Sequence, residues 1–321
     1  AYFVWLNSGK ESVALDLKIA DDKKLLINML KRADVFIQNI SPGAISRLGI
    51  QLLEIRKQNP GLITCSINGY GEQGPYKEQK AYDLLIQAES GLCSVTGIED
   101  QLTRVGVSVS DIAAGMNAYQ EILLALYRRE KDPQKKGEDI SVSLFHSSTD
   151  WMNVPYLQYI YGGKMPKNLG LEHPTIAPYG SFTTLENKQI LISVQNQREW
   201  ERFCDRVLNR PRLKEHKLFL NNPDRVKNRA DLNQIIDGIF SRTCEKELIE
   251  RLNEAGIAFG KINDVAALRN HPQAKFRRVQ TKKGQVTMLG RGAKKESSTE
   301  KMLRIPDLNE HGEKIRAEFS S

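Results

Sequence analysis

Two aspartates, Asp83 and Asp111, stand where a carboxylate can take part in chemistry. Asp83 closes the segment Lys80-Ala81-Tyr82-Asp83, just after a glycine-rich loop at residues 69–75, and Asp111 stands at the expected start of a long helix. A carboxylate at a helix start is commonly a cap that stabilises the helix by about 1 kcal/mol. It can also be a nucleophile that attacks an activated acyl group, provided that nearby amides stabilise the oxyanion. The residues alone leave both interpretations open.

Other kinds of site lack support in the sequence. The chain contains no GxGxxG or GxxxxGK[ST] motif and no GxSxG motif, which argues against dinucleotide, P-loop and α/β-hydrolase sites. The five histidines show no ligand spacing, and none of the four cysteines forms a CxxC pair. We therefore expect no metal site and no permanently bound cofactor, with the cysteines buried or idle in a reducing cytosol.

Composition limits the partners. The 321 residues are 40% hydrophobic and 27% charged, as in a globular protein of roughly two domains. The net charge of +8 favours anionic partners such as phosphorylated metabolites. The basic runs at residues 135–136 and 291–295 lack the interleaved aromatics that stack on bases, so we expect no nucleic acid. Without an apolar run of about 18 residues or a signal sequence, we expect no membrane association and a cytoplasmic location.

The hydrophobic pattern predicts an α/β fold, and the pattern changes near residue 179. Strands expected at residues 12–17, 34–38, 62–68 and 140–145 alternate with helices expected at 21–32, 44–48, 51–58 and 111–129. This alternation indicates a parallel sheet, whose ligands usually bind beyond the carboxyl ends of the strands. Residues 39–41 and 68–75 are therefore candidate ligand loops. A strand-like stretch at 105–110 precedes Asp111.

Beyond residue 179 the pattern indicates antiparallel strands at 181–184 and 189–194. Helices are expected there at 199–208, 230–240 and 245–255, exposed strands with loops at 282–301, and a final loop and helix at 306–319. We predict a large Rossmann-like domain without a dinucleotide site at residues 1–178, a smaller α+β domain at 179–258, and a segment at 259–321 that returns to the large domain.

Five ordered phrases carry a resemblance to a known family. They are LNSGKESVALDLK, ADVFIQNISPGAISRLG, NPGLITCSINGYGEQGPY, KAYDLLIQAESGL and RVGVSVSDIAAGMNA, and the likeness continues through HPTIAPYGSFTT, ILISVQNQREWERFC, INDVAALRNHPQ and EHGEKI. Together they resemble the family III coenzyme A transferases, which include formyl-CoA and carnitine-type transferases and the related 2-methylacyl-CoA racemases. The resemblance covers essentially the whole chain. It implies an interlaced homodimer.

The resemblance also implies roles for individual residues. The aspartate that becomes acylated and then carries CoA as a thioester matches Asp111, and a neighbouring acidic residue and its tyrosine match Asp83 and Tyr82. Substrate contacts on the acyl side are placed in a lid at residues 173–179. The CoA contacts match Leu15, Asp16, Leu17, Lys18, Asn39, Ile40, Ser41, Arg47, Lys80, Ala81, Tyr82 and Asp83.

The implied reaction is a ping-pong exchange between an acyl-CoA and a carboxylic acid acceptor, with short dicarboxylic or branched acyl groups as the expected substrates. One alternative is a 2-methylacyl-CoA racemase, although that branch carries a histidine where this chain has Tyr82. Another is an inactive CoA-binding homologue, since family chains begin with a further strand and helix that supply a glutamine and an arginine. His146 stands where close relatives often carry aspartate, and this position is not the nucleophile in the matched pattern.

Overall fold

A computed structural model describes residues 1–99, 101–293 and 302–320. Its contacts define two compact units: the first comprises Ala1–Leu92, Val105–Val154 and Asn270–Ser321, and the second comprises Cys93–Arg104 and Pro155–Arg269. The second unit includes the hairpin of β3 (Gly97–Ile98) and β4 (Gln101–Leu102) because the hairpin pairs with a later segment. The Glu99 amide donates to the Asn168 carbonyl at 2.9 Å, and the Gly170 amide donates to the Gly97 carbonyl at 2.7 Å. The domain boundaries expected from the sequence fall elsewhere and stay a prediction.

A parallel sheet forms the centre of the first unit. Its strands β1 (Val35–Gln38), β2 (Ile63–Asn68) and β5 (Asp139–Ser143) lie in the order β1-β2-β5. Both pairings are parallel, with Ile37 opposite Cys65 and Cys65 opposite Ile140. The prediction of an α/β fold is confirmed. The strand β5 ends two residues earlier than the expected strand at 140–145, because the helix α7 (Leu144–Trp151) begins directly after Ser143.

Two apolar cores cover the two faces of this sheet. Successive strand residues point to opposite faces, so Val35 packs in one core and Phe36 in the other. The core around Phe36 includes Leu30, Ile50 and Ile55, from or beside the helices α2 (Ala20–Leu30), α3 (Ala44–Arg47) and α4 (Leu52–Gln58). The core around Val35 is completed by α5 (Asp83–Glu89), α6 (Val109–Lys131) and α7.

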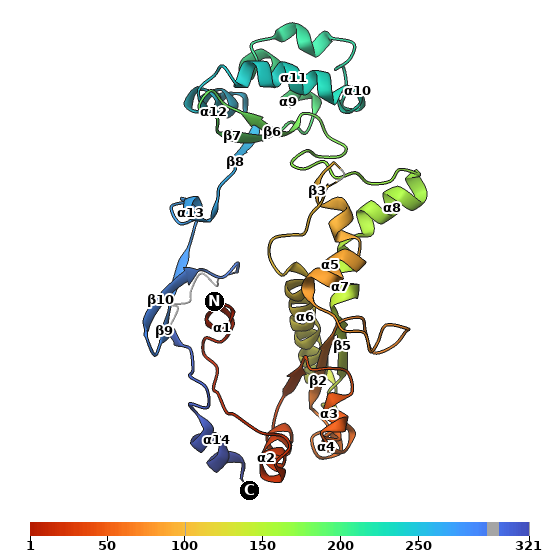
Figure 1. Ribbon diagram of the computed structural model, residues 1–321, viewed down its shortest axis with the longest axis vertical. Coiled ribbons are helices and arrows are strands. Elements are labelled where there is room, and N and C mark those ends of the chain that lie inside the picture. The colour runs from red at the N-terminus through yellow and green to blue at the C-terminus, as the bar shows by residue number, and fades with distance from the viewer. Residues whose placement is uncertain (100, 294–301, 321) are drawn as a thin grey trace. The chain divides into compact units, whose positions relative to one another are not determined.

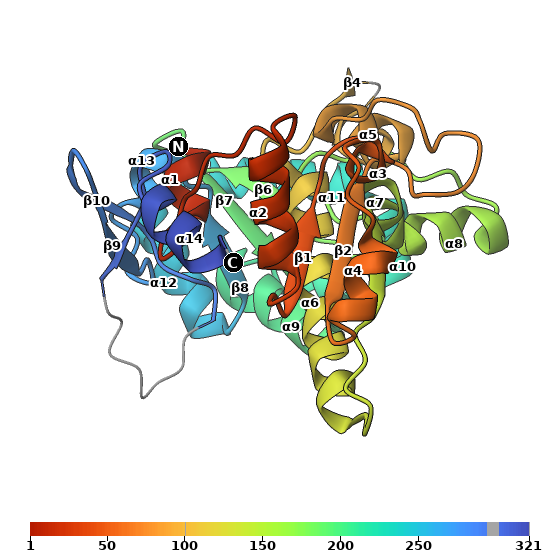
Figure 2. The ribbon, with the colours of Figure 1, turned by 90° about the horizontal axis from the view of Figure 1, so that it is seen from below.

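The C-terminal helix packs against an early helix of the chain in the first unit. The last helix, α14 (Gly312–Phe319), lies beside α2, as Figure 1 and Figure 2 both show. Its Arg316 binds Asp22 of α2. The remaining elements of this unit are α1 (Tyr2–Leu6) and a small sheet of β9 (Phe276–Thr281), β10 (Gly284–Leu289) and β11 (Leu303–Arg304). Of the exposed strands expected at 282–301, β10 is present, and residues 294–301 lie outside the described part.

The prediction of a strand at residues 12–17 is wrong. Side chains take the backbone amides of this segment instead of a neighbouring strand. Ser12 N donates to His311 Nδ1 at 3.1 Å, and Ala14 N donates to Asn309 Oδ1 at 3.0 Å. Alternating hydrophobic residues therefore did not produce a strand here, because the backbone amides have side-chain partners.

The second unit contains an antiparallel sheet with helices packed on it. Its largest buried side chains include Trp200, Phe203 and Phe240. The expected hairpin is present as β6 (Tyr179–Thr183) and β7 (Gln189–Ser193), joined by β8 (Ala258–Lys261). The helices are α8 (Asn153–Gly162), α9 (Gln197–Arg202), η2 (Phe203–Val207), η3 (Pro211–Glu215), α10 (Asn222–Lys227), α11 (Arg229–Phe240), α12 (Glu245–Ala255) and α13 (Val265–Leu268), with η1 (Leu92–Val95) at the boundary between the units. In the described part of the chain, no helix is both long and apolar enough to span a bilayer.

Candidate active site

A cavity of about 470 Å³ opens at the carboxyl ends of the parallel strands in the first unit. This is the edge of the sheet at which the sequence predicts a ligand. The lining residues come from the loop after β1, the end of β2, the segment before α5, and the starts of α6 and α7. They are Asn39, Ile40, Ser41, Pro42, Ile67, Asn68, Gly69, Glu78, Gln79, Lys80, Ala81, Tyr82, Asp83, Asp111 and Leu144.

A glycine at position 69 lets two of these segments approach each other. A Cβ atom on Gly69 would lie 2.3 Å from Ala81 Cβ, which is closer than two carbon atoms can come. The end of β2 and the segment from Lys80 to Asp83 therefore lie in direct contact. The Asn68 side chain shapes the same turn by accepting a hydrogen bond from the Gly71 amide at 2.6 Å.

The Asp83 carboxylate ties the starts of two helices together. Asp83 is the first residue of α5, and its Oδ1 accepts a hydrogen bond from the Ser110 amide in the first turn of α6 at 2.8 Å. Its Oδ2 accepts one from Gln87 Nε2, also at 2.8 Å. Both oxygens are thus engaged, and Asp83 acts as a structural bridge at the edge of the cavity.

The segment before Asp111 differs from the expected strand. α6 begins at Val109, and the residues ahead of it form bends. The reason is that the buried Gln87 side chain bonds this backbone: the Val105 amide donates to Gln87 Oε1 at 2.8 Å. Asp111 consequently lies inside the first turn of a 23-residue helix. There the positive end of the helix dipole favours an anion.

The Asp111 carboxylate is in the opposite situation to that of Asp83. The residue is exposed to the cavity, and among the described residues no hydrogen bond or ion pair engages its oxygens. Neighbouring atoms nevertheless desolvate the carboxyl group in part and raise its pKa, and the negative charge of Asp83 raises it further. A carboxylate that is unbonded and partly desolvated is suited to attack an electrophile.

Of the residues predicted to contact CoA, those between positions 39 and 41 and between 80 and 83 line the cavity. Arg47 stands just outside it, because its guanidinium donates to the Pro42 carbonyl at 2.9 Å and to Ser41 Oγ at 3.3 Å. The segment Leu15, Asp16, Leu17 and Lys18 does not line it. That segment is held beside α2, where the Asp16 amide donates to Asp22 Oδ2 at 2.7 Å.

His146 lies on α7, away from the cavity lining. Its Nδ1 is 2.6 Å from Ser143 Oγ, and its amide donates to that same oxygen at 3.0 Å, so the pair caps the start of α7. α7 in turn braces α6, because Ser148 Oγ lies 3.0 Å from Ser110 Oγ in a buried contact. The histidine thus has a local structural role in this chain.

The sequence reasoning missed Gln87, and it placed Asn68 only within a candidate ligand loop, without the role of its side chain in the turn. Gln87 follows Asp83 by four residues, the spacing that puts two side chains on the same face of a helix, and this was the signal that could have revealed it. Asn68 ends a strand directly before a glycine, a position where its side chain can bond the following turn.

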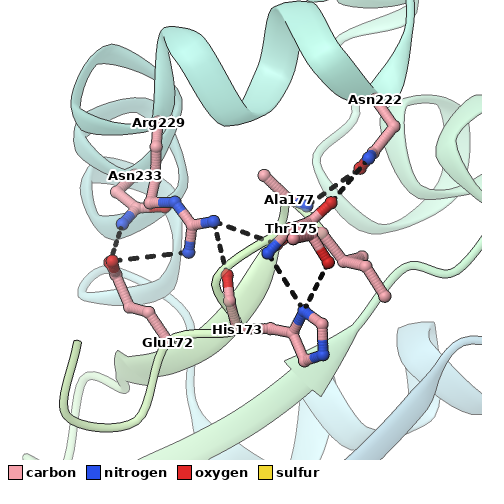
Figure 3. A network of polar contacts seen from close by, with 8 residues as sticks. Glu172, His173, Thr175, Ala177, Asn222, Arg229 and Asn233 are labelled. Atoms are coloured by element: carbon pink, nitrogen blue, oxygen red, sulfur yellow. Dashed lines mark hydrogen bonds and ion pairs between the residues drawn. The ribbon is translucent and has the colours of Figure 1, made fainter. Parts of the chain in front are cut away.

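The loop at residues 173–179, expected to be a lid, is held by a polar network within the second unit (Figure 3). The Arg229 guanidinium donates to the His173 carbonyl at 2.5 Å and to the Ile176 carbonyl at 3.2 Å. Asn222 bonds the loop at both Thr175 and Ala177. The His173 ring stacks on Tyr179 with centroids 5.1 Å apart. Every one of these contacts fixes the loop to its own unit.

Comparison with known proteins places the chain in a family. The sequence profile of CoA-transferase family III matches residues 1–312. The chain belongs to CoA-transferase family III. It is 34% identical to an acetyl-CoA:oxalate CoA-transferase of Acetobacter aceti, over the whole chain and 82% of that protein. It is 32% identical to a mouse succinyl-CoA:glutarate CoA-transferase over 82% of the chain, which spans 60% of the mouse protein.

A solved structure agrees with this assignment. A CAIB/BAIF family protein from Brucella suis is 30% identical and superposes with a TM-score of 0.83, over 99% of this chain and 84% of that one. The sequence-based prediction of a family III CoA-transferase is therefore confirmed.

Proposed function

We propose that this protein transfers coenzyme A from an acyl-CoA to a carboxylic acid, with Asp111 as the nucleophile. The observation that carries the proposal is the contrast between the two carboxylates at the cavity. Asp83 has both oxygens engaged by hydrogen bonds, whereas the Asp111 carboxylate is unbonded among the described residues, partly desolvated and open to the cavity.

In the first half-reaction, an Asp111 oxygen attacks the thioester carbonyl carbon. The C–S bond breaks, CoA leaves as a thiolate, and a mixed anhydride remains on Asp111. The thiolate then attacks the side-chain carbonyl carbon of Asp111, which releases the donor acid as its carboxylate and leaves an aspartyl-CoA thioester. No proton or electron is gained or lost, so the ionised form of Asp111 is the reactive one.

In the second half-reaction, the acceptor carboxylate attacks the aspartyl thioester and expels the CoA thiolate. A new mixed anhydride forms between the acceptor and Asp111. The thiolate attacks the acyl carbon of the acceptor, which yields the new acyl-CoA and regenerates the Asp111 carboxylate. Between these steps the protein must keep the free CoA thiolate close to Asp111. We assign this task to the residues that line the cavity, to Arg47, and to Lys18 with its neighbouring residues.

We further propose short dicarboxylic or branched acyl groups as substrates, since the relatives' names specify oxalate and glutarate. The racemase alternative has less support, because none of the described residues that line the cavity is a histidine and Tyr82 is 71% exposed.

We also propose a homodimer. Large apolar side chains such as Tyr119, Leu123 and Tyr127 are exposed on α6, as expected of a surface that a second copy covers. A monomer at micromolar concentration in sedimentation velocity would contradict the dimer.

The direct test of the nucleophile is the substitution Asp111→Asn, which keeps the shape and removes the reactive anion. We expect kcat to fall by about 10³-fold or more with oxalate, succinate or glutarate as acceptors, and the thermal midpoint to stay within about 2 °C. Asp150→Asn, an exposed change on α7, is the matched control and should retain full activity. Full activity of Asp111→Asn would contradict the proposal.

A further inference from the structure

Gln87 is a fully buried polar side chain directly behind the candidate active site. It lies on α5 with 0% of its surface exposed, and both ends of its amide are used. Nε2 donates to Asp83 Oδ2 at 2.8 Å and lies 3.4 Å from the carbonyls of Val105 and Val107. Oε1 accepts a hydrogen bond from the Val105 amide at 2.8 Å. A primary amide offers two N–H donors and a carbonyl acceptor at one position, which matches this set of partners.

These contacts form a continuous chain to the nucleophile. Gln87 fixes one oxygen of Asp83, the other oxygen of Asp83 receives the Ser110 amide, and Ser110 precedes Asp111. Gln87 also fixes the backbone at Val105, just ahead of α6. The entry into α6 is therefore held from two sides by one side chain, and a buried network of this kind has a single satisfied geometry.

We infer that Gln87 is a positioning residue for CoA transfer: by holding Asp83 and the backbone at residues 105–107, it fixes the direction in which Asp111 faces the cavity. The inference rests on the proposed function of Asp111 as nucleophile. Gln87 itself does not line the cavity, so it acts through Asp83 and Ser110 and has no contact with the substrate.

Two substitutions separate positioning from simple packing. Gln87→Met keeps the length of the side chain and removes both hydrogen-bonding ends. Gln87→Glu keeps the shape, and its protonated form can donate to Asp83 while its carbonyl oxygen accepts from Val105. Its ionised form instead places a second negative charge against Asp83. The other charged groups at this site are Asp111, Glu78 and Lys80, all of which face the cavity.

We expect Gln87→Met to lower kcat between about 10- and 100-fold, with KM for the acyl-CoA changed less than about threefold. The activity of Gln87→Glu relative to the unmodified protein should rise as the pH falls from 8 to 5.5, because protonation restores the hydrogen bonds. Gln58→Met, an exposed change on α4, should alter neither constant. Equal losses for Met and Glu at every pH would overturn the inference, as would full activity of Gln87→Met.

A second measurement does not depend on turnover. In hydrogen–deuterium exchange, the amides of Val105 and Ser110 should exchange at least about tenfold faster in Gln87→Met, while the amides of β2 keep their protection. Unchanged exchange at both amides would overturn the inference even if Asp111 proves to be the nucleophile. Faster exchange in a protein without transferase activity would instead contradict the proposed function and leave the positional role of Gln87 standing.

Discussion

The two units use buried polar groups in opposite ways. In the second unit, Arg225 is 1% exposed. Its guanidinium donates hydrogen bonds to the backbone carbonyls of Ala177 and Phe219, at 2.8 and 3.2 Å, and to the Gln197 side chain. All of these Arg225 contacts are made to atoms within the second unit. In the first unit, the network of Gln87 and Asp83 ends one residue short of Asp111. In the proposed mechanism, the reactive group is the carboxylate beside this network that no hydrogen bond from the described residues engages.

Breaking the network of the second unit should have the larger effect, and it should appear in stability. We expect Arg225→Met to lower the free energy of unfolding by about 2–4 kcal/mol, because it leaves two buried carbonyls without a donor and removes the cation that stands 4.8 Å from the centre of the Trp200 ring. Urea unfolding followed by tryptophan fluorescence measures the change.

The control for Arg225 is Arg206→Met. Arg206 is exposed, and its guanidinium also donates to a backbone carbonyl, that of Glu254, at 3.0 Å. We expect a loss of no more than about 0.5 kcal/mol, since water can replace this donor. If the two variants lose equal stability, the buried network of the second unit does not have the structural role that we assign to it.

Breaking the bridge of the first unit should have a smaller effect, visible in the pH dependence of activity. Asp83→Asn removes a negative charge beside Asp111 and puts an amide group opposite two donors. We expect kcat at neutral pH to fall about tenfold, because one of the charge-assisted hydrogen bonds is lost. The acidic limb of the kcat profile should move to lower pH.

The direction in which the acidic limb moves follows from what raises the Asp111 pKa. The Asp111 pKa is raised chiefly by partial burial and secondly by the charge of Asp83. The proposed mechanism uses the ionised form of Asp111. Activity is therefore lost as the pH falls through that raised pKa. Removal of the Asp83 charge lowers the pKa and extends activity to lower pH. An acidic limb that stays in place, or moves to higher pH, would show that Asp83 does not act on Asp111 electrostatically.

Sequence patterns predicted the parallel sheet and its ligand edge, because apolar strand and helix periods reflect burial on two faces. They failed at residues 12–17 and 105–110, where side chains distant in sequence, Asn309 and Gln87, take the backbone hydrogen bonds. No local pattern contains such partners. For Asp83 and Asp111, residue types alone placed both at the site, and the family resemblance implied that Asp111 is the acylated residue. Only the structure shows that Asp83 is held as a bridge while no hydrogen bond from the described residues engages Asp111.

The most direct test of the account is to trap the covalent intermediate. The full chain is incubated with acetyl-, oxalyl-, succinyl- or glutaryl-CoA, quenched with hydroxylamine and analysed by peptide mass spectrometry. We expect a hydroxamate on Asp111 with at least one donor, absent from the Asp111→Asn protein. Transferase turnover with no label, or with the label on Asp83, would contradict the assignment of Asp111 as the nucleophile.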